Sequence, residues 1–165
     1  SIHFKPDGTK MYMLGMDNDT VYQYSLSTAW DLSTASYDSV SFGVDSEEVT
    51  PLGIHFKGDG TKMYMVGDNT DTVYQYSLST AWDLSTASYD SVNFDVGSED
   101  IHPQSIHFKE DGAKMYMVGS DTDTVYQYTT AELFSGTVYS TISLANLASR
   151  ALSDLSNVNV SSPTA

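Results

Sequence analysis

The stretch DTVYQYSLSTAWDLSTASYDSV, residues 71–92, stands letter for letter a second time at residues 19–40. A longer unit surrounds it, because Ile-His-Phe-Lys begins at Ile2, Ile54 and Ile106, a spacing of 52 residues. Tandem units of this size are typical of repeat proteins, in which each unit buries its faces against its neighbours. The chain is therefore predicted to contain three consecutive copies of one small structural unit.

Within one unit, apolar residues alternate with polar ones over short runs, which is typical of antiparallel strands. Residues 58–61 and 67–71 of the middle copy are rich in Gly, Asp, Asn and Thr, and these residues favour tight turns. Residues 77–87 form a longer predicted loop that carries Trp82. The strands expected in this copy span residues 53–57, 62–66, 72–76 and 88–96.

Four up-and-down strands in about 50 residues describe one blade of a β-propeller. The segment GIHFKGDGTKMYMVG, a spacer and then DTVYQYSLST resemble propeller repeats of the YVTN type, whose hallmark includes SPDGKRLYV. Residues 5–12, KPDGTKMY, match that signature best, and Pro51 and Pro103 stand where those repeats place a proline. The resemblance covers residues 1–144 and implies an all-β fold.

The expected fold class is thus all-β, with three four-stranded antiparallel propeller blades of about 52 residues. Blade three has a divergent last strand, expected over residues 137–144. Beyond it, apolar residues at helical spacing over residues 143–155 predict a short helix. The expected segments are residues 1–53, 54–105 and 106–144 for the blades, and 145–165 for the short helix and a linker or oligomerisation tail.

Three blades do not close a ring, since propellers usually have about four or more. Two ways of closing it are expected: further blades that precede Ser1, or association of two or three copies of the chain. An open array would leave two sheet faces in water.

The charge and the lack of cysteine exclude several classes of binding partner and site. The chain has 22 acidic and 7 basic residues and a formal net charge of −15. This charge repels phosphate backbones and anionic lipid surfaces, so neither nucleic-acid binding nor membrane insertion is expected. No cysteine is present, which excludes disulfides, thiolate metal sites and a cysteine nucleophile.

His3, His55 and His107 occupy one repeat position, on the strand that lines the central channel of a propeller. Two interpretations stay open. Three imidazoles that converge on a channel could bind a transition metal. Alternatively, each ring is a packing residue that recurs because the unit was duplicated.

Acidic residues cluster in the turns, and two interpretations are open for them also. Asp and Asn are preferred in hairpin turns, but clustered oxygen atoms also suit calcium, the only cofactor expected here. The acidic links at residues 45–48 and 98–100 are expected to be solvated loops. The candidate metal ligands are Asp17, Asp19, Asp68, Asp71, Asp121 and Asp123.

Trp30 and Trp82 stand in the repeated loop Ser-Thr-Ala-Trp-Asp-Leu-Ser, followed by Asp31 and Asp83. An exposed Trp beside an Asp could stack on a sugar ring, so these four residues are candidate ligand-binding residues for a surface glycan. The alternative is that each Trp packs against the neighbouring blade.

The leading functional hypothesis is a non-enzymatic structural or adhesive module. The tail SLANLASRALSDLSNVNVSSPTA, residues 143–165, resembles segments of phage tail-fibre and virion-surface proteins. This resemblance implies a virion or extracellular location and partners among virion proteins or host-surface glycans. No G-x-S-x-G or H-E-x-x-H motif supports catalysis.

Two alternatives remain. The first is a secreted bacterial propeller with lactonase-like or quinoprotein-like activity, for which His3, His55 and His107 are the candidate channel residues. The second is an engineered consensus repeat, which would explain the identical copies but not the divergent third unit.

Overall fold

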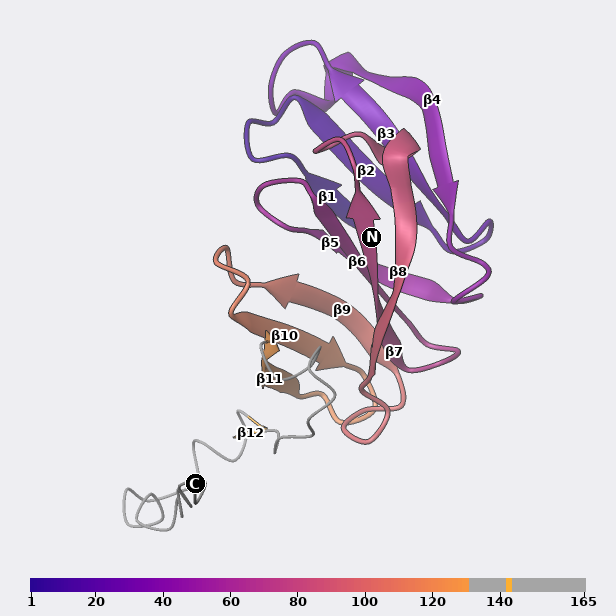
Figure 1. Cartoon of the computed structure of the whole chain (residues 1–165), viewed down its shortest axis with the longest axis vertical. Coiled ribbons are helices and arrows are strands. Elements are labelled where there is room, and N and C mark those ends of the chain that lie inside the picture. Colours follow the sequence, from indigo (N-terminus) through magenta and orange to yellow (C-terminus); the bar gives the residue numbers. More distant parts are fainter. Residues whose placement is uncertain (131–141, 144–165) are drawn as a thin grey trace, which may run out of the picture.

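The computed structural model describes residues 1–130 and 142–143, and it confirms the predicted all-β fold of three four-stranded antiparallel sheets. Each sheet is one blade, and the three follow one another along the molecule (Figure 1). Blade 1 contains β1 (Ile2–Phe4), β2 (Lys10–Gly15), β3 (Thr20–Leu26) and β4 (Ala35–Gly43). Blade 2 contains β5 (Pro51–Phe56), β6 (Lys62–Gly67), β7 (Thr72–Leu78) and β8 (Ala87–Asp95). Blade 3 contains β9 (Pro103–Phe108), β10 (Lys114–Gly119), β11 (Val125–Thr129) and β12 (Ile142–Ser143).

The first hairpin turn of each blade depends on a glycine. Gly60, between β5 and β6, has a φ of +73°, a conformation that residues with a Cβ rarely adopt. Its missing side chain also leaves room for a ring, since a Cβ on Gly60 would lie 2.3 Å from Nε1 of Trp82. The same turn recurs in blade 1, where Gly8 lies under Trp30. These two glycines therefore leave room for the long loops of blades 1 and 2 to pack on the first hairpins.

The long loop contains a short element that the sequence did not predict. Residues Leu32–Thr34 form the 3₁₀ turn η1 in blade 1, and Leu84–Thr86 form η2 in blade 2. The carboxylate of Asp31 accepts a hydrogen bond of 3.0 Å from Ser33 N and so caps η1. Asp83 caps η2 in the same way. Aspartate at this position thus serves the loop's own structure.

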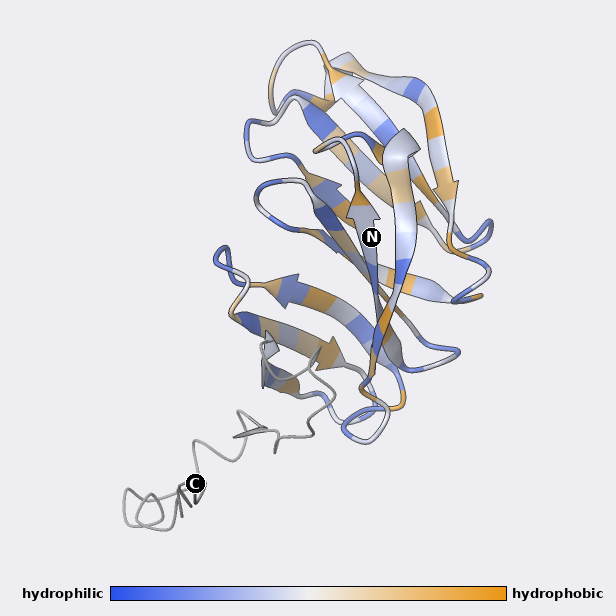
Figure 2. Cartoon of the chain, viewed as in Figure 1, coloured by the Kyte–Doolittle hydropathy of each residue, from blue (hydrophilic) through white to orange (hydrophobic). Residues whose placement is uncertain are grey.

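Two apolar cores lie between the blades. One face of blade 1 and the facing side of blade 2 form the first core, and blades 2 and 3 form the second. The strands β1, β5 and β9 lie next to one another, β1 with β5 and β5 with β9. Orange and blue segments alternate along many of the strands in Figure 2, as expected where successive side chains point to opposite faces. Blade 2 is covered on both sides, and its strands β5 and β6 are buried except for one half-buried residue in each.

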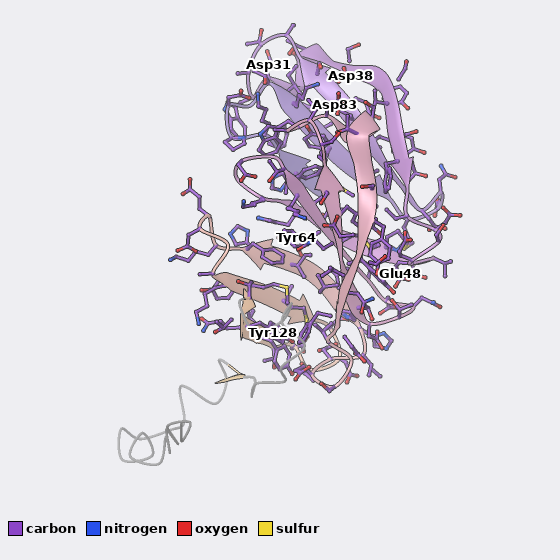
Figure 3. The ribbon with its side chains drawn as sticks, viewed as in Figure 1. Asp31, Asp38, Glu48, Tyr64, Asp83 and Tyr128 are labelled. Carbon is purple, nitrogen blue, oxygen red and sulfur yellow. The ribbon has the colours of Figure 1, made fainter. Side chains whose placement is uncertain are left out.

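The acidic links are solvated only in part: Asp45, Ser46 and Ser98 are exposed as expected, but each link also contains one buried carboxylate that the sequence did not predict. Glu48, labelled beside blade 2 in Figure 3, is 1% exposed and accepts hydrogen bonds from the backbone N–H groups of Thr50, Asn69 and Thr70. Asp100 is 2% exposed and binds the corresponding turn of blade 3. Burial opposes ionisation of Asp100, but these hydrogen bonds outweigh it and lower its pKa. Each link therefore fastens one blade to the next through a buried carboxylate.

β12 pairs with β11 and gives blade 3 its fourth strand. The remainder of the predicted last strand, the predicted helix and the linker lie outside the described residues. Within the described part of the chain, no helix has the length and apolar character needed to cross a membrane.

Candidate functional site

The three repeated histidines form a row across the inner strands. His3 on β1 lies 5.0 Å from His55 on β5, measured between ring centroids, and His55 lies 4.8 Å from His107 on β9. Both pairs meet edge to face. Each ring also meets an aromatic residue of the next blade, since His3 is 5.3 Å from Phe56 and His55 is 5.5 Å from Phe108. The sequence predicted that these three residues lie together, and the structure confirms it. They are called the histidine row below.

The rings of the histidine row differ in exposure. His55 is 9% exposed and His3 is half-buried, whereas His107 is exposed. Burial disfavours the charged imidazolium and lowers the pKa of His3 to about 4 and that of His55 to about 3. Neighbouring histidines add to both shifts. At neutral pH these two side chains are therefore neutral imidazoles, and the row ends in a ring that solvent reaches.

The described residues contain no group of three or more His, Asp or Glu side chains arranged to hold a metal ion. The transition-metal interpretation of the row therefore receives no geometric support. A neutral imidazole still offers one donor and one acceptor nitrogen, so the row can donate to, or accept from, a bound molecule or water.

The fourth histidine, His102, has a partner that the sequence did not reveal. Its Nδ1 lies 2.8 Å from Oδ1 of Asp68, and this hydrogen bond raises the pKa of His102. The pair joins the link before blade 3 to a turn of blade 2. His102 stands in the link before β9 and not at the repeated position of the histidine row.

The aspartates of the candidate calcium turns lie in different surroundings. Asp19 and Asp71 adopt positive φ, +46° and +50°, and each has a buried Oδ1 atom without a hydrogen-bond partner. Burial, with nearby Asp68, raises the pKa of Asp71. Asp17, Asp121 and Asp123 are exposed. Calcium at these turns stays a prediction.

The two tryptophan loops differ sharply. Trp82 is 9% exposed and packs on blade 1, with its ring centroid 6.2 Å from that of Tyr12. Trp30 is 61% exposed, and its ring centroid lies 5.3 Å from that of Phe4 in its own blade. The aspartates beside them, Asp31 and Asp83, cap the 3₁₀ turns (Figure 3). Ligand binding by these loops stays a prediction, and an exposed ring is available for it only at Trp30.

Each lysine of the described residues has a polar partner. Lys10 lies 3.0 Å from Asp38 and Lys62 lies 2.6 Å from Asp90, in equivalent positions of blades 1 and 2. Burial opposes ionisation of Asp38, but hydrogen bonds from Gln23, Ser25 and Lys10 outweigh it and lower its pKa. The other pairs are Lys5–Asp7, Lys57–Asp59, Lys109–Asp111 and Lys114–Thr129. The described residues thus present no unpaired lysine to a phosphate group.

No family model matches this chain, and no curated protein matches it in sequence. Solved structures do match it in shape. A protein of Bacteroides fragilis named as a candidate 6-phosphogluconolactonase superposes with a TM-score of 0.64 at 16% identity, covering 87% of this chain and 38% of its own. The periplasmic gluconolactonase PpgL of Pseudomonas aeruginosa gives a TM-score of 0.59 at 13% identity, covering 86% and 38%.

A third neighbour is the β-propeller domain of Cps50 (Swd1) from Myceliophthora thermophila, with a TM-score of 0.51, 11% identity and coverage of 78% and 37%. The chain therefore spans less than two fifths of each of these proteins. At such low identity the likeness establishes the fold alone: the described part of the chain consists of β-propeller blades.

These neighbours contradict the leading functional expectation. A non-enzymatic structural or adhesive module of a phage virion was expected from the tail, yet named sugar lactonases stand among the structural neighbours. The expectation that the protein is not an enzyme is contradicted by the same finding. The virion and adhesion assignments likewise find no support. That expectation rested on about twenty residues of tail, whereas the structural likeness extends over the blades.

Proposed function

We propose that this chain supplies three blades of a β-propeller that hydrolyses an uncharged sugar lactone, with the histidine row as its contribution to the site. The carrying observation is the row itself: two neutral imidazoles, half-buried His3 and buried His55, lead to the exposed His107 on the inner strands. The shape likeness to proteins named as lactonases supports this choice. The YVTN-type resemblance of residues 5–12 and an extracellular location belong to the same proposal.

Lactone hydrolysis needs a base for the attacking water. Water adds to the lactone carbonyl carbon and gives a proton to an imidazole, the bond from that carbon to the ring oxygen breaks, and the ring oxygen takes up the proton. In this proposal the exposed His107 is the catalytic base. His55 and His3 are positioning residues, because their rings pack edge to face behind His107 and stay neutral.

The charges favour a lactone without phosphate. The chain carries a net charge of −15, and every lysine of the described blades is paired. A phosphorylated lactone would meet repulsion and no unpaired lysine on the described blades. Because the chain spans under two fifths of its neighbours, the complete site would include groups from other blades around the channel.

The test is hydrolysis of glucono-δ-lactone by the purified chain, followed by acid release at constant pH. His107→Asn should lower the rate above background by about 100-fold, the lower end of what a general base contributes. His102→Asn, outside the row, should leave the rate unchanged.

A second measurement covers the case in which the chain binds but lacks groups from other blades. NMR signals of the His107 imidazole should shift when gluconate, the product, is added, and the His102 signals should not. The proposal is overturned if the chain neither accelerates hydrolysis nor shows the shift, or if His102→Asn lowers the rate as much as His107→Asn.

A further inference from the structure

The outer face of blade 1 is an apolar sheet face that nothing in the described chain covers. It consists of Ile2, Phe4, Tyr24, Trp30 and Leu32. Ile2 is 60% exposed, and Trp30 and Leu32 are both 61% exposed. Figure 1 shows this blade at one end of the row of blades and blade 3 at the other. Monomeric proteins rarely leave such contiguous apolar surfaces open.

Blade 2 shows what this face is built to contact. Its equivalent residues are buried against blade 1: Ile54 is 4% exposed, Trp82 9% and Leu84 0%. Two hydrogen bonds fix the contact, one of 2.6 Å from the Tyr12 hydroxyl to the Trp82 carbonyl and one of 2.9 Å from Leu84 N to the Gln23 side chain. The surface of blade 1 that receives blade 2, here called the receiving surface, therefore contains Tyr12 and Gln23 on paired strands, beside the aliphatic pair Leu14 and Val21.

Blade 3 carries the same receiving surface, and it is open. Tyr116 pairs with Gln127 in register, and Val118 with Val125, as Tyr12 pairs with Gln23 and Leu14 with Val21 in blade 1. The neighbours Met115 and Met117 face blade 2, so Tyr116 and Val118 point away from it. We call Tyr116, Val118, Val125 and Gln127 the outer face of blade 3.

The exposures confirm that this second surface is unoccupied within the described chain. Val118 is 38% and Val125 is 41% exposed, whereas the equivalent residues Leu14 and Val21 are 5% and 0% exposed. The outer faces of blades 1 and 3 thus correspond to the two sides of the contact that joins neighbouring blades twice inside the chain.

We propose that a second copy of this chain docks head to tail, with its blade 3 outer face on the blade 1 outer face of the first copy. Each new contact continues the series of inter-blade contacts, and two copies close a ring of six blades. The contact is heterologous, and closure prevents an open filament. This inference is independent of the proposed lactone hydrolysis.

The net charge of each copy is −15, so association works against repulsion between copies. Added salt screens this repulsion, while the apolar contact is kept. The dimer is therefore expected to strengthen as salt is raised, unlike a complex held by opposite charges.

The experiment measures solution mass by light scattering after size exclusion for the wild type, Leu32→Asp and Val125→Asp. The wild type should have twice the 18.1 kDa chain mass. Each variant alone should be a monomer, with a dissociation constant raised at least about 30-fold, as for an interface hot spot. Circular dichroism checks that both variants keep the fold.

The decisive step is to mix the two variants. The Leu32→Asp copy keeps an intact blade 3 face and the Val125→Asp copy an intact blade 1 face, so the mixture should recover a dimer through one intact contact. A wild type that stays monomeric at millimolar concentration and high salt overturns the proposal. So does a dimer lost in only one of the two variants, because that result indicates a like-with-like contact.

Discussion

Blades 1 and 2 contain the same 22 residues in two different surroundings. Their backbones agree closely: φ is +65° at Trp30 and +63° at Trp82, and the following aspartate caps a 3₁₀ turn in both. The burial of equivalent side chains differs between the two blades, since Trp30 is 61% exposed and Trp82 is 9% exposed. The repeat sequence therefore determines the local structure of a blade, whereas the neighbouring blade determines which of its residues become core.

The tryptophan pair gives the largest expected difference. Trp82→Ala opens a cavity between blades 1 and 2 and should lower the free energy of unfolding by about 3–4 kcal/mol. Trp30→Ala removes the same ring from an exposed site and should cost less than about 1 kcal/mol when measured on the monomer. Urea unfolding of both variants checks this, and equal losses would contradict the comparison.

The buried link carboxylate gives the next largest effect. Glu48→Ala leaves the N–H groups of Thr50, Asn69 and Thr70 without their acceptor and should cost about 2–3 kcal/mol. Asp45→Ala, in the same link but exposed, is the control and should be within about 0.5 kcal/mol of the wild type. If both substitutions cost the same, the link does not fasten blade 1 to blade 2.

The histidine row gives a pH-dependent difference. His55 has a pKa of about 3 in the folded chain against 6.5 unfolded, so its stabilising effect is complete above pH 6.5 and is lost as pH falls. A fall from pH 7 to pH 5 should therefore lower the free energy of unfolding by about 2 kcal/mol through this one group. In His55→Phe this part of the decline should disappear. An identical pH profile for the variant and the wild type would contradict the burial of this ring.

The glutamine pair gives the smallest effect. Gln23→Ala leaves the buried Leu84 N–H unpaired and should cost about 1–2 kcal/mol. Gln127→Ala, at the equivalent position on the open face of blade 3, should have almost no effect in the monomer. Thermal unfolding of dilute samples distinguishes the two, and a larger loss for Gln127→Ala would show that its face is already covered.

Much of the fold followed from pattern alone. The period of 52 residues, the alternation of apolar residues and the turn glycines predicted four strands per blade, because these features act within a few residues of one another. The burial of Glu48 and Asp100 was missed because their partners lie in a turn 21 and 22 residues away, which no local pattern reveals.

The candidate site was predictable only in part. The repeat placed His3, His55 and His107 together, since equivalent positions of stacked blades must lie in a row. It did not reveal that His55 is enclosed while His107 stays exposed, because identical sequence carries no information about which blade is at an end. The Asp68–His102 pair joins two non-equivalent turns and had no signal in the repeat.

The most direct test of this account compares two single-tryptophan variants by fluorescence. Trp30→Phe keeps only Trp82, and Trp82→Phe keeps only Trp30. In dilute solution, Trp82 should emit at shorter wavelength and resist quenching by acrylamide, whereas Trp30 should emit as a solvated ring and be quenched readily. Equal emission and equal quenching of the two rings would contradict the claim that the neighbouring blade, and not the sequence of the repeat, decides what is buried.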